Sequence, residues 1–382
     1  MGKQYITTAA IGLAHKSDIF DVAVCDRYTI TCSSDGFLKF WDNKIEVTEE
    51  ASKAIFVDKL GLHHISAIEK VRDGSSVVII ATVAFTGRCY LYQYDSQTDE
   101  VTKLDSNLPT ELSSPKISFW APNLHIDIAD ETIYFAATTA VGATYVFKIN
   151  VPEEGELQLV YTGKTDTNDT SFATAIGIGS GSAIAVGHQN GNVYLYDLKS
   201  LRLIYTFPSL GVRLDQDDTG SSLSTVRKAI FSPDCKLMAV ARDSGAYGIV
   251  ALYDVKYGET IGTLSVPTHS SNVSVGGYTH EGWCLAIDFN EGGTLLATAG
   301  YDDKVRIWNV DTRERESTIT ISRTDVADEA VDQEDQSDNL VTSSLKFLKK
   351  GVRTGAGTDT NEGLVVVGLD RAIRWYREAG GI

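Results

Sequence analysis

Residues 34–42 read SDGFLKFWD, and residues 301–309 read YDDKVRIWN. In both stretches an acidic turn leads into an alternating strand, which ends on Trp followed by Asp or Asn. The turn aspartate stands six residues before the tryptophan in each case, at Asp35 and Trp41 and again at Asp302 and Trp308. Two matching stretches so far apart in one chain indicate an internal structural repeat.

The same ending recurs in weaker form along the chain. If the aromatic residue at the end of the strand after the turn marks each copy, the sequence holds seven copies of roughly 50 residues each. Copies of this kind with a Trp-Asp ending are typical of WD repeats, each of which forms one four-stranded blade of a β-propeller. The markers are Trp41, Tyr92, Phe147, Tyr196, Tyr253, Trp308 and Trp375.

Short alternating runs separated by Gly, Asn and Asp turns predict strands throughout, and no long stretch has helical periodicity. The sequence therefore predicts an all-β, seven-bladed WD40 β-propeller in which residues 1–382 form a single domain. A strand-like run at residues 3–11 precedes the first repeat. We expect it to close the last blade, which would protect an open sheet edge. The predicted blades span approximately residues 12–43, 60–95, 117–150, 170–199, 223–256, 279–311 and 340–377.

Two blades carry a histidine before the first strand, a threonine on the second strand, the turn aspartate and the tryptophan. A buried imidazole and a buried carboxylate both need hydrogen-bond partners, and each supplies the other's. A His–Asp–hydroxyl cluster is also the pattern of a hydrolase triad. A structural role is favoured because the cluster repeats with the fold, whereas a catalytic set need appear only once. The two sets are His15, Thr31, Asp35 and Trp41, and His280, Thr298, Asp302 and Trp308.

The composition favours a soluble protein-binding protein. A net charge of −17 disfavours direct binding of nucleic acid and favours a basic or mixed-charge protein partner. No apolar run approaches the roughly 18 residues of a membrane span, and we expect neither a signal peptide nor a membrane contact. Five scattered cysteines favour a reducing compartment. The acidic segment 325–338 is interpreted either as a solvated loop or as a docking segment.

Motifs for catalysis or cofactor binding are weak. Residues 163–165 read GKT, but the first glycine of a P-loop would fall at Gln158. Residues 177–181 read GIGSG and lie among predicted blade strands, which favours a turn over a dinucleotide site. His63 and His64 have no further ligand at metal spacing. We therefore expect no enzymatic activity, no cofactor and no metal site.

A partner is expected to bind the rim of loops that precedes the first strand of each blade. A monomeric protein without a partner rarely exposes several large apolar side chains together, and aromatic patches are typical of binding hot spots. The alternative is that each tryptophan only covers the core of its own blade. Taking the residue before the first inward-facing apolar position gives Asp18, His64, Trp120, Phe172, Thr225, Trp283 and Val341, to which we add Phe20 and, in blade seven, Arg371 and Arg374.

Longer strings in the chain closely resemble the WD-repeat subunit of the superkiller (Ski) complex. A generic WD protein would share the blade endings but not these strings. They are SVPTHSS at 265–271, HEGWCLAIDFN at 280–290 and LDRAIRWYREAGG at 369–381, with GLHH at 61–64, SFWA at 118–121 and FLKKG at 347–351.

The resemblance implies a non-catalytic scaffold. In that family the propeller binds a tetratricopeptide-repeat subunit and works with a DExH RNA helicase in the cytoplasm, where the complex delivers messenger RNA to the exosome for 3′-to-5′ decay. Some relatives also act in the nucleus, in a transcription-elongation complex or with the meiotic double-strand-break protein. The main alternative is a WD40 adaptor of another assembly, such as a transcription-elongation or chromatin complex, a ubiquitin-ligase receptor or a meiotic recombination factor.

The resemblance also implies a ligand for the rim. The family's partners present a short Gln-Arg-x-x-hydrophobic motif. We expect Asp18 to pair with the arginine of that motif, and Trp120 or Trp283 to receive its apolar residue.

Overall fold

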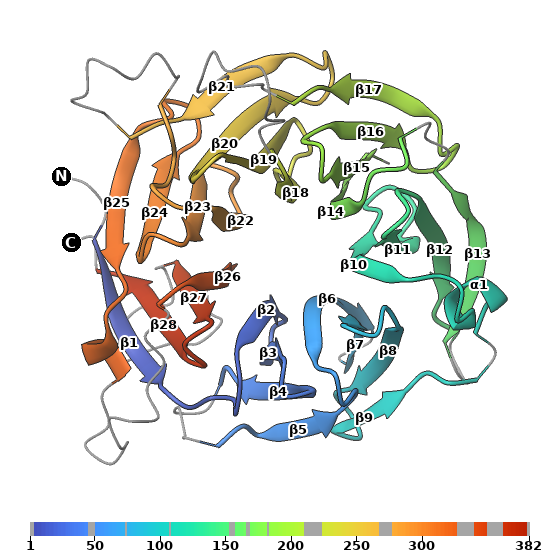
Figure 1. Cartoon of the computed structure of the whole chain (residues 1–382). Coiled ribbons are helices and arrows are strands. Elements are labelled where there is room, and N and C mark those ends of the chain that lie inside the picture. The colour runs from blue at the N-terminus through green and yellow to red at the C-terminus, as the bar shows by residue number, and fades with distance from the viewer. Residues whose placement is uncertain are drawn as a thin grey trace.

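The computed structural model folds into seven four-stranded antiparallel sheets arranged around a central axis (Figure 1). The prediction of an all-β, seven-bladed WD40 propeller is confirmed. The structure describes residues 4–44, 50–72, 75–106, 108–152, 157–165, 169–181, 183–209, 224–266, 277–326, 340–349 and 362–379.

The strands occupy equivalent places in all seven blades (Figure 1). The first strands, which line the axis, are β2 (Ile19–Val24), β6 (Leu62–Arg72), β10 (Phe119–Ile126), β14 (Ala173–Gly179), β18 (Val226–Phe231), β22 (Cys284–Phe289) and β26 (Thr342–Leu348). The second strands are β3 (Tyr28–Ser33), β7 (Ser75–Ala84), β11 (Ile133–Thr139), β15 (Ala183–His188), β19 (Leu237–Ser244), β23 (Leu295–Gly300) and β27 (Gly363–Gly368). The third strands are β4 (Phe37–Asp42), β8 (Cys89–Asp95), β12 (Thr144–Asn150), β16 (Val193–Asp197), β20 (Tyr247–Asp254), β24 (Lys304–Asn309) and β28 (Ile373–Glu378).

The outer strands complete the blades. They are β5 (Lys53–Phe56), β9 (Glu100–Lys103), β13 (Gln158–Lys164), β17 (Leu203–Phe207), β21 (Thr260–Leu264), β25 (Arg315–Thr320) and, for the last blade, β1 (Tyr5–Ile11). The described residues also include two short helical segments, α1 (Thr110–Ser113) and η1 (Arg323–Val326).

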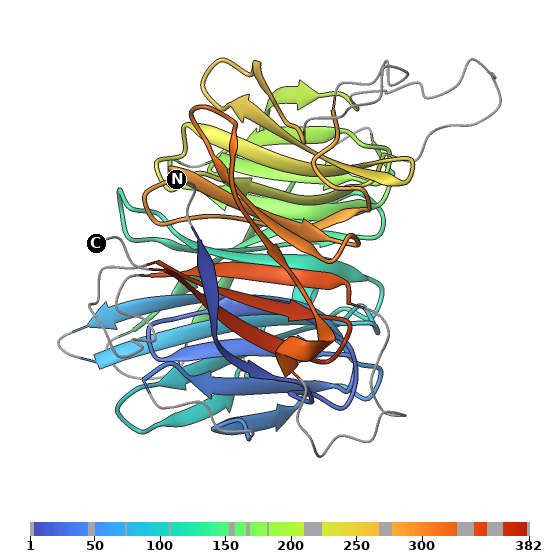
Figure 2. The ribbon, with the colours of Figure 1, turned by 90° about the vertical axis from the view of Figure 1, so that its left-hand side faces the viewer.

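The N-terminal strand closes the ring. β1 pairs antiparallel with β28, with Tyr5 opposite Glu378 and Ile11 opposite Ile373. The N–H of Ala379 donates to the carbonyl oxygen of Gln4 at 2.7 Å. Both views show the two ends of the described chain on the same blade (Figures 1 and 2). The predicted closure is therefore confirmed, and it covers the edge that β28 would otherwise expose.

The predicted blade ranges end before the outer strand in the first six blades, so β5, β9, β13, β17, β21 and β25 fall between them. These strands are short and mostly solvent-facing, as in β9 with the sequence EVTK. They lack the strong apolar alternation by which a strand can be recognised.

The core lies between neighbouring blades. At the junction of blades seven and one, Trp41 and Trp375 pack edge to face with ring centroids 6.3 Å apart. The same cluster includes Ile19 and Val367. Burying each such large apolar side chain stabilises the fold by about 1.5–3 kcal/mol. The ring therefore holds together by apolar contact between blades as well as by the β1–β28 pairing.

In blade one the structure brings the four predicted polar residues together. The Nδ1 atom of His15 lies 3.0 Å from Oδ2 of Asp35, and its Nε2 lies 2.8 Å from Oγ1 of Thr31. The indole N–H of Trp41 donates to the same hydroxyl oxygen at 3.0 Å. A neutral imidazole protonated on Nδ1 satisfies every member: it donates to the carboxylate and accepts the threonine proton. The set fixes the second and third strands against the segment that enters the blade.

Blade six repeats this arrangement and adds a buried arginine. Distances of 2.8 Å join His280 Nδ1 to Asp302 Oδ1 and His280 Nε2 to Thr298 Oγ1, and the Trp308 indole donates to the threonine at 2.9 Å. The guanidinium of Arg306, itself buried, donates to Oδ2 of Asp302 at 2.6 Å. Burial opposes ionisation of Asp302, but its hydrogen bonds to His280 and Arg306 outweigh that effect and hold its pKa well below the ordinary value.

Asp302→Asn is therefore expected to lower the free energy of unfolding by about 2–3 kcal/mol, because the buried charge of Arg306 loses its ionic partner. Asp35→Asn in blade one is expected to cost less. No arginine of the described residues bonds Asp35, and the nearby ammonium group of Lys39 donates instead to the carbonyl oxygen of Ala14 at 2.6 Å. Urea unfolding followed by circular dichroism compares the two variants, and an equal or larger loss for Asp35→Asn would contradict this account.

Candidate functional site

Each first strand carries a β-bulge near its beginning. In all seven sheets the register between the first and second strands shifts within the first residues of the first strand, as between Ile19 and Asp21 in β2. A bulge leaves one residue unpaired and re-aims its side chain. We call the end of the propeller where the first strands begin the rim face. The residues at the bulges are Phe20, His63, Trp120, Thr174, Arg227, Leu285 and Ser343.

An arc of aromatic rings crosses blades one to four on the rim face. Phe20 packs edge to face on Phe85 with centroids 5.3 Å apart, and Phe85 lies 4.9 Å from His63. The His63 ring stacks on Trp120 at 4.2 Å, and Trp120 packs edge to face on Phe172 at 4.9 Å. We call these five residues the aromatic arc. Its rings are in continuous contact; His63 is buried, Phe20, Trp120 and Phe172 are partly buried, and Phe85 is the most exposed member at 44%.

A second aromatic group joins blades five and six. Trp283, which precedes β22, is 38% exposed. Its indole N–H donates to the carbonyl oxygen of Gly245 at 2.9 Å, and the Trp283 and Tyr301 rings pack edge to face with centroids 5.5 Å apart. The guanidinium carbon of Arg227 lies 4.7 Å from the Trp283 ring centroid, a cation–π contact, and the same guanidinium forms a salt bridge with Asp243. We call Trp283 with these neighbours the Trp283 platform.

The platform depends on a glycine. A Cβ atom at Gly300 would lie 1.8 Å from the carbonyl oxygen of Trp283, which accepts the N–H of Tyr301 at 3.1 Å. No other residue permits this approach of the two backbones. Gly300 therefore lets the segment before β22 sit directly on the end of β23.

Gly300→Ala is accordingly expected to displace Trp283 and to lower the free energy of unfolding by about 1–3 kcal/mol, the usual cost of an overpacked site. Gly292→Ala is the matched control, since the nearest atom to its added Cβ would be 3.8 Å away. Thermal unfolding of both variants tests this. A Gly300→Ala protein as stable as the control would show that the backbone yields freely here.

Asp18 lies half-buried at the start of blade one. Its backbone carbonyl accepts the N–H of Ser34 at 3.0 Å, which fixes the local chain. Burial raises the pKa of its carboxyl group, the charge of Arg371 works in the opposite direction, and Asp370 raises it further. Asp18 therefore shares its surroundings with Arg371 and Asp370, two charged residues of blade seven.

Three predicted rim residues are buried instead of exposed. Val341 is 4% exposed, and its carbonyl oxygen accepts the N–H of Leu369 at 2.9 Å. Thr225 is also buried. Arg374 is 1% exposed and donates to Asp370 at 2.6 Å, so it belongs to the interior of blade seven, as Arg306 does in blade six. The expectation that Val341 and Arg374 are exposed at the rim is therefore wrong, because both are buried. The signal available in the sequence was the four-residue Asp-to-Arg spacing that both blades share.

The predicted register was also wrong in blades two and three. The residues that precede the first strand there are Gly61 and Ser118, so His64 and Trp120 stand later in the chain than assumed. His64 is the third residue of β6 and lines the central cavity, while Trp120 occupies the bulge of β10. In these two blades the apolar pattern fits more than one strand start, because Leu62 and Ile65, and likewise Phe119 and Ala121, are apolar.

Some rim-face residues were not predicted at all. Phe85 and Tyr301 follow the second strands of blades two and six, in turns that lie at the same end as the strand starts. Both are 44% exposed. Tyr301 is the first residue of the turn 301–303, which joins the second and third strands of blade six. Antiparallel pairing places every turn of this kind on the rim face, so Tyr301 could have been predicted there.

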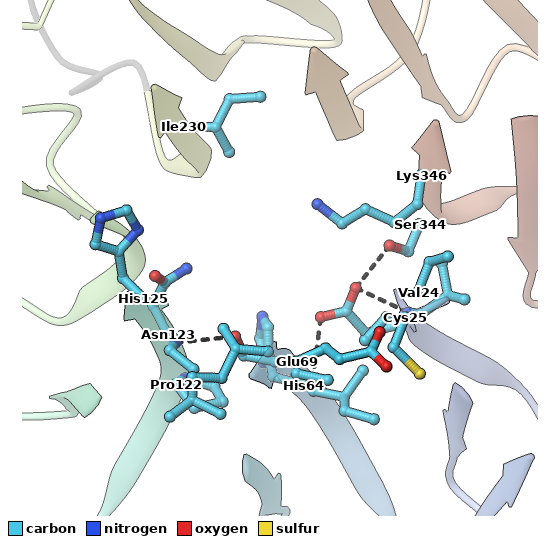
Figure 3. Close-up of a pocket in the computed structure, with 18 of the residues that line it drawn as sticks. Val24, Cys25, His64, Glu69, Pro122, Asn123, His125, Ile230, Ser344 and Lys346 are labelled. Atoms are coloured by element: carbon cyan, nitrogen blue, oxygen red, sulfur yellow. Dashed lines mark hydrogen bonds between the residues drawn. The ribbon is translucent and has the colours of Figure 1, made fainter. Parts of the chain in front are cut away.

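The first strands also line a cavity of about 1060 Å³ along the axis (Figure 3). At one level the buried carboxylate of Asp21 accepts the hydroxyl of Ser344 at 2.6 Å and the N–H of Ile65 at 3.3 Å. The ammonium group of Lys228 lies 3.3 Å from the same carboxylate. Figure 3 shows Ser344 and Lys346 across the cavity from Asn123 and His125. One carboxylate thus joins blades one, two, five and seven.

Other sites are not evident among the described residues. Within that part of the chain, no three His, Cys, Asp or Glu side chains are placed to hold a metal ion. No helix in the described ranges is long and apolar enough to cross a membrane. The acidic segment, interpreted as a loop or a docking segment, lies outside the described residues from position 327 onward.

Comparison with known proteins identifies relatives. The family model "WD domain, G-beta repeat" matches residues 8–42 and 263–309, which include both of the stretches 34–42 and 301–309 in full. The chain is 38% identical over 407 residues to "Antiviral protein SKI8" of Saccharomyces cerevisiae, covering 100% of both proteins. It is 25% identical to "Meiotic recombination protein rec14" of Schizosaccharomyces pombe over 68% of this chain and 74% of that protein. A shorter match, 30% identical over 37% of this chain and 20% of the relative, is to "Actin-interacting protein 1" of Drosophila melanogaster.

Proposed function

The chain belongs to the family of Antiviral protein SKI8, and on that premise we propose that it is a non-catalytic scaffold of a superkiller complex. In this role it bridges a tetratricopeptide-repeat subunit and a DExH RNA helicase in the cytoplasm, and so serves exosome-mediated 3′-to-5′ decay of messenger RNA. The observation that carries the proposal is the 38% identity over the whole of both chains.

The rim face is the proposed binding surface. The aromatic arc and the Trp283 platform supply partly or fully exposed rings, with Phe85, Trp283 and Tyr301 the most exposed, in a fixed geometry that is typical of a hot spot. The net charge of −17 favours a partner that brings a cation. A Gln-Arg-x-x-hydrophobic motif suits both features: its arginine pairs with Asp18, and its apolar residue docks on Trp120 or Trp283.

The two His–Asp–Thr clusters support a scaffold role without catalysis. The His–Asp–Thr set occurs in the same geometry in blade one and in blade six, where it ties strands together. A reactive site would need to differ from its structural copy.

Co-purification with the repeat subunit from the same organism tests the proposal. Trp120→Ala combined with Trp283→Ala is expected to weaken capture at least about tenfold, since both rings belong to the proposed hot spot. Tyr257→Ala is the matched control: it removes an aromatic ring that is 61% exposed in the β20–β21 turn, at the opposite end of the propeller. A folded double variant that binds as well as the control would dismiss the rim face as the binding surface.

The likeness to rec14 supports a second candidate role, as a nuclear adaptor in meiotic recombination. The same purification separates the two. Recovery of a helicase and a repeat subunit supports the first role, whereas recovery of recombination proteins without either supports the second.

A further inference from the structure

We propose that Asn190 is a deamidation site, that Asp169 holds the reaction back, and that the product cannot return to the place of Asn190 in blade four. Asn190 and Gly191 stand in the turn between β15 and β16, and they are the only Asn-Gly pair in the chain. Asparagine is a thermolabile residue, and a following glycine has no side chain to hinder attack by its backbone nitrogen. The inference goes beyond the proposed function and does not depend on it.

The reaction needs only the chain, a base and water. The backbone nitrogen of Gly191 gives its proton to the base and bonds to Cγ of Asn190, while the Cγ–Nδ2 bond breaks and ammonia leaves. Water then opens the resulting cyclic imide at either of its carbonyl carbons. The product is an aspartate at position 190 or an isoaspartyl linkage, in which the backbone is longer by a carbon atom.

Hydrogen bonds engage both reacting groups in the folded protein. Nδ2 of Asn190 donates to Oδ2 of Asp169 at 2.8 Å, and Oδ1 of Asn190 accepts the N–H of Asn192 at 3.1 Å. The N–H of Gly191 donates to the carbonyl oxygen of His188 at 3.0 Å. Because the nucleophile and the side chain that it must attack are both held, the turn has to open before the imide can form.

Asp169 is an ionised acceptor at the centre of this turn. Its side chain is 13% exposed, and it also accepts the N–H of Ser171 at 2.9 Å and the hydroxyl of Tyr194 at 2.8 Å. Burial opposes ionisation of Asp169, but its hydrogen bonds with Ser171 and Asn190 outweigh that effect and hold its pKa well below the ordinary value. Its bond to Asn190 is therefore charge-assisted, which makes it stronger than a bond between neutral groups.

Blade two contains the same arrangement without an asparagine. Oδ2 of Asp58 accepts the hydroxyl of Thr86 at 2.9 Å and that of Tyr90 at 2.8 Å. Thr86 stands before a glycine with positive φ, as Asn190 does. A threonine thus supplies the donor that this turn requires, and the asparagine of blade four adds a reactive group that the fold does not need.

The product cannot restore the contacts of Asn190. A carboxylate in place of the amide would put a negative charge where Nδ2 now lies 2.8 Å from Asp169, and like charges so close repel each other. An isoaspartyl linkage would also displace Gly191, whose carbonyl oxygen accepts Nε of the buried Arg242 of blade five at 2.9 Å. Deamidation is therefore a one-way change that loosens blade four and its junction with blade five.

Mass spectrometry of peptides from protein incubated in mildly alkaline buffer measures the reaction. Folded wild type is expected to deamidate at Asn190 at least about tenfold more slowly than a synthetic peptide of residues 186–196, which corresponds to an opening free energy of about 1.4 kcal/mol. Equal rates in the protein and the peptide would overturn the proposal. This comparison needs no variant.

Two matched variants test the role of Asp169. Asp169→Ser should raise the rate at Asn190 in the folded protein by about tenfold, because a charge-assisted hydrogen bond is lost. Asp58→Ser removes the equivalent carboxylate from blade two and should leave that rate unchanged. An equal increase in both variants would mean that Asp169 acts only through the stability of the whole ring, and its proposed role would fall.

Two substitutions of Asn190 test the consequence. Asn190→Asp reproduces one product and should lower the melting temperature by at least about 2 °C. Asn190→Thr copies blade two, so it should melt as wild type does and yield no deamidated product at this position. An Asn190→Asp protein that melts with wild type would show that the turn accepts the second carboxylate, and the one-way change would be refuted.

Discussion

Asp21→Ala is expected to lower the free energy of unfolding by about 3–5 kcal/mol, the cost of removing one partner from a buried ionic site. Asp21 is 3% exposed at the level where the first strands approach the axis. Its carboxylate is the shared acceptor for Ser344 of blade seven, the backbone N–H of Ile65 in blade two and the ammonium group of Lys228 in blade five.

The size of this loss of stability follows from the polar groups that Asp21→Ala would leave without a partner. Without the carboxylate, the hydroxyl of Ser344 and the N–H of Ile65 lose their acceptor in the interior, and each unsatisfied group costs about 1–3 kcal/mol. Lys228 loses its ion pair as well, although its side chain is 26% exposed and keeps access to solvent. Because the donors come from different blades, the loss should loosen the ring as a whole.

Urea unfolding with two comparison variants tests this prediction. Asp26→Ala removes a surface aspartate, 63% exposed and 3.5 Å from Lys44, and should change the free energy of unfolding by no more than about 0.5 kcal/mol. Lys228→Met should cost less than Asp21→Ala, because the carboxylate would keep its hydrogen bonds to Ser344 and Ile65. Similar losses for Asp21→Ala and Asp26→Ala would show that the axis is not held by this carboxylate.

Local spacing explains why the fold could be predicted from the sequence. The interval from Asp35 to Trp41, and from Asp302 to Trp308, is six residues because one turn and one strand separate the two residues. It can therefore be recognised directly in the sequence. The position of His15 and His280 before the first strand of a repeat predicted their contact with those aspartates, and the structure contains both contacts. The outer strands were missed because a short solvent-facing strand such as β9 has no apolar signature.

The site was harder to predict because it depends on features that no short window contains. The first strands of blades two and three begin at Leu62 and Phe119, earlier than the apolar pattern indicated, which misplaced His64 and Trp120. Arg227 and Trp283 come from different blades, and nothing in either local sequence states that they meet. Residues that meet only through tertiary structure require the structure itself.

Acidification is expected to destabilise the protein as the pH falls below about 6.5, the ordinary pKa of histidine. Burial is the main reason that the pKa of every described histidine is lowered, to about 4 for His63. A group with a lowered pKa in the fold stays neutral there while the unfolded chain takes up its proton. Its stabilising contribution is present above the unfolded pKa and is lost as the pH falls toward the folded one. The described histidines are His15, His63, His64, His125, His188 and His280.

The carboxylates act in the same direction at lower pH. Burial opposes ionisation of Asp35, but its bonds to His15 and to the N–H groups of Phe37 and Lys16 hold its pKa at about 2. Its contribution is present above the unfolded pKa of about 4 and is lost as the pH falls below that value. One influence opposes the trend: the net charge of −17 diminishes on acidification, which relieves repulsion. Added salt screens that repulsion between exposed charges and leaves the buried groups largely unaffected.

Urea unfolding in about 0.3 M salt, at pH values of about 7.5, 6.5 and 5.5, measures the balance. The free energy of unfolding should fall with pH, by about 1.4 kcal/mol per pH unit for each extra proton that the unfolded chain binds. His280→Gln should be less stable than wild type but should show a shallower dependence on pH, because one buried imidazole no longer contributes. Equal free energies of unfolding at the highest and lowest pH would contradict this prediction. They would mean that the histidines bind protons as readily in the folded protein as in the unfolded chain, although burial disfavours the charged imidazolium.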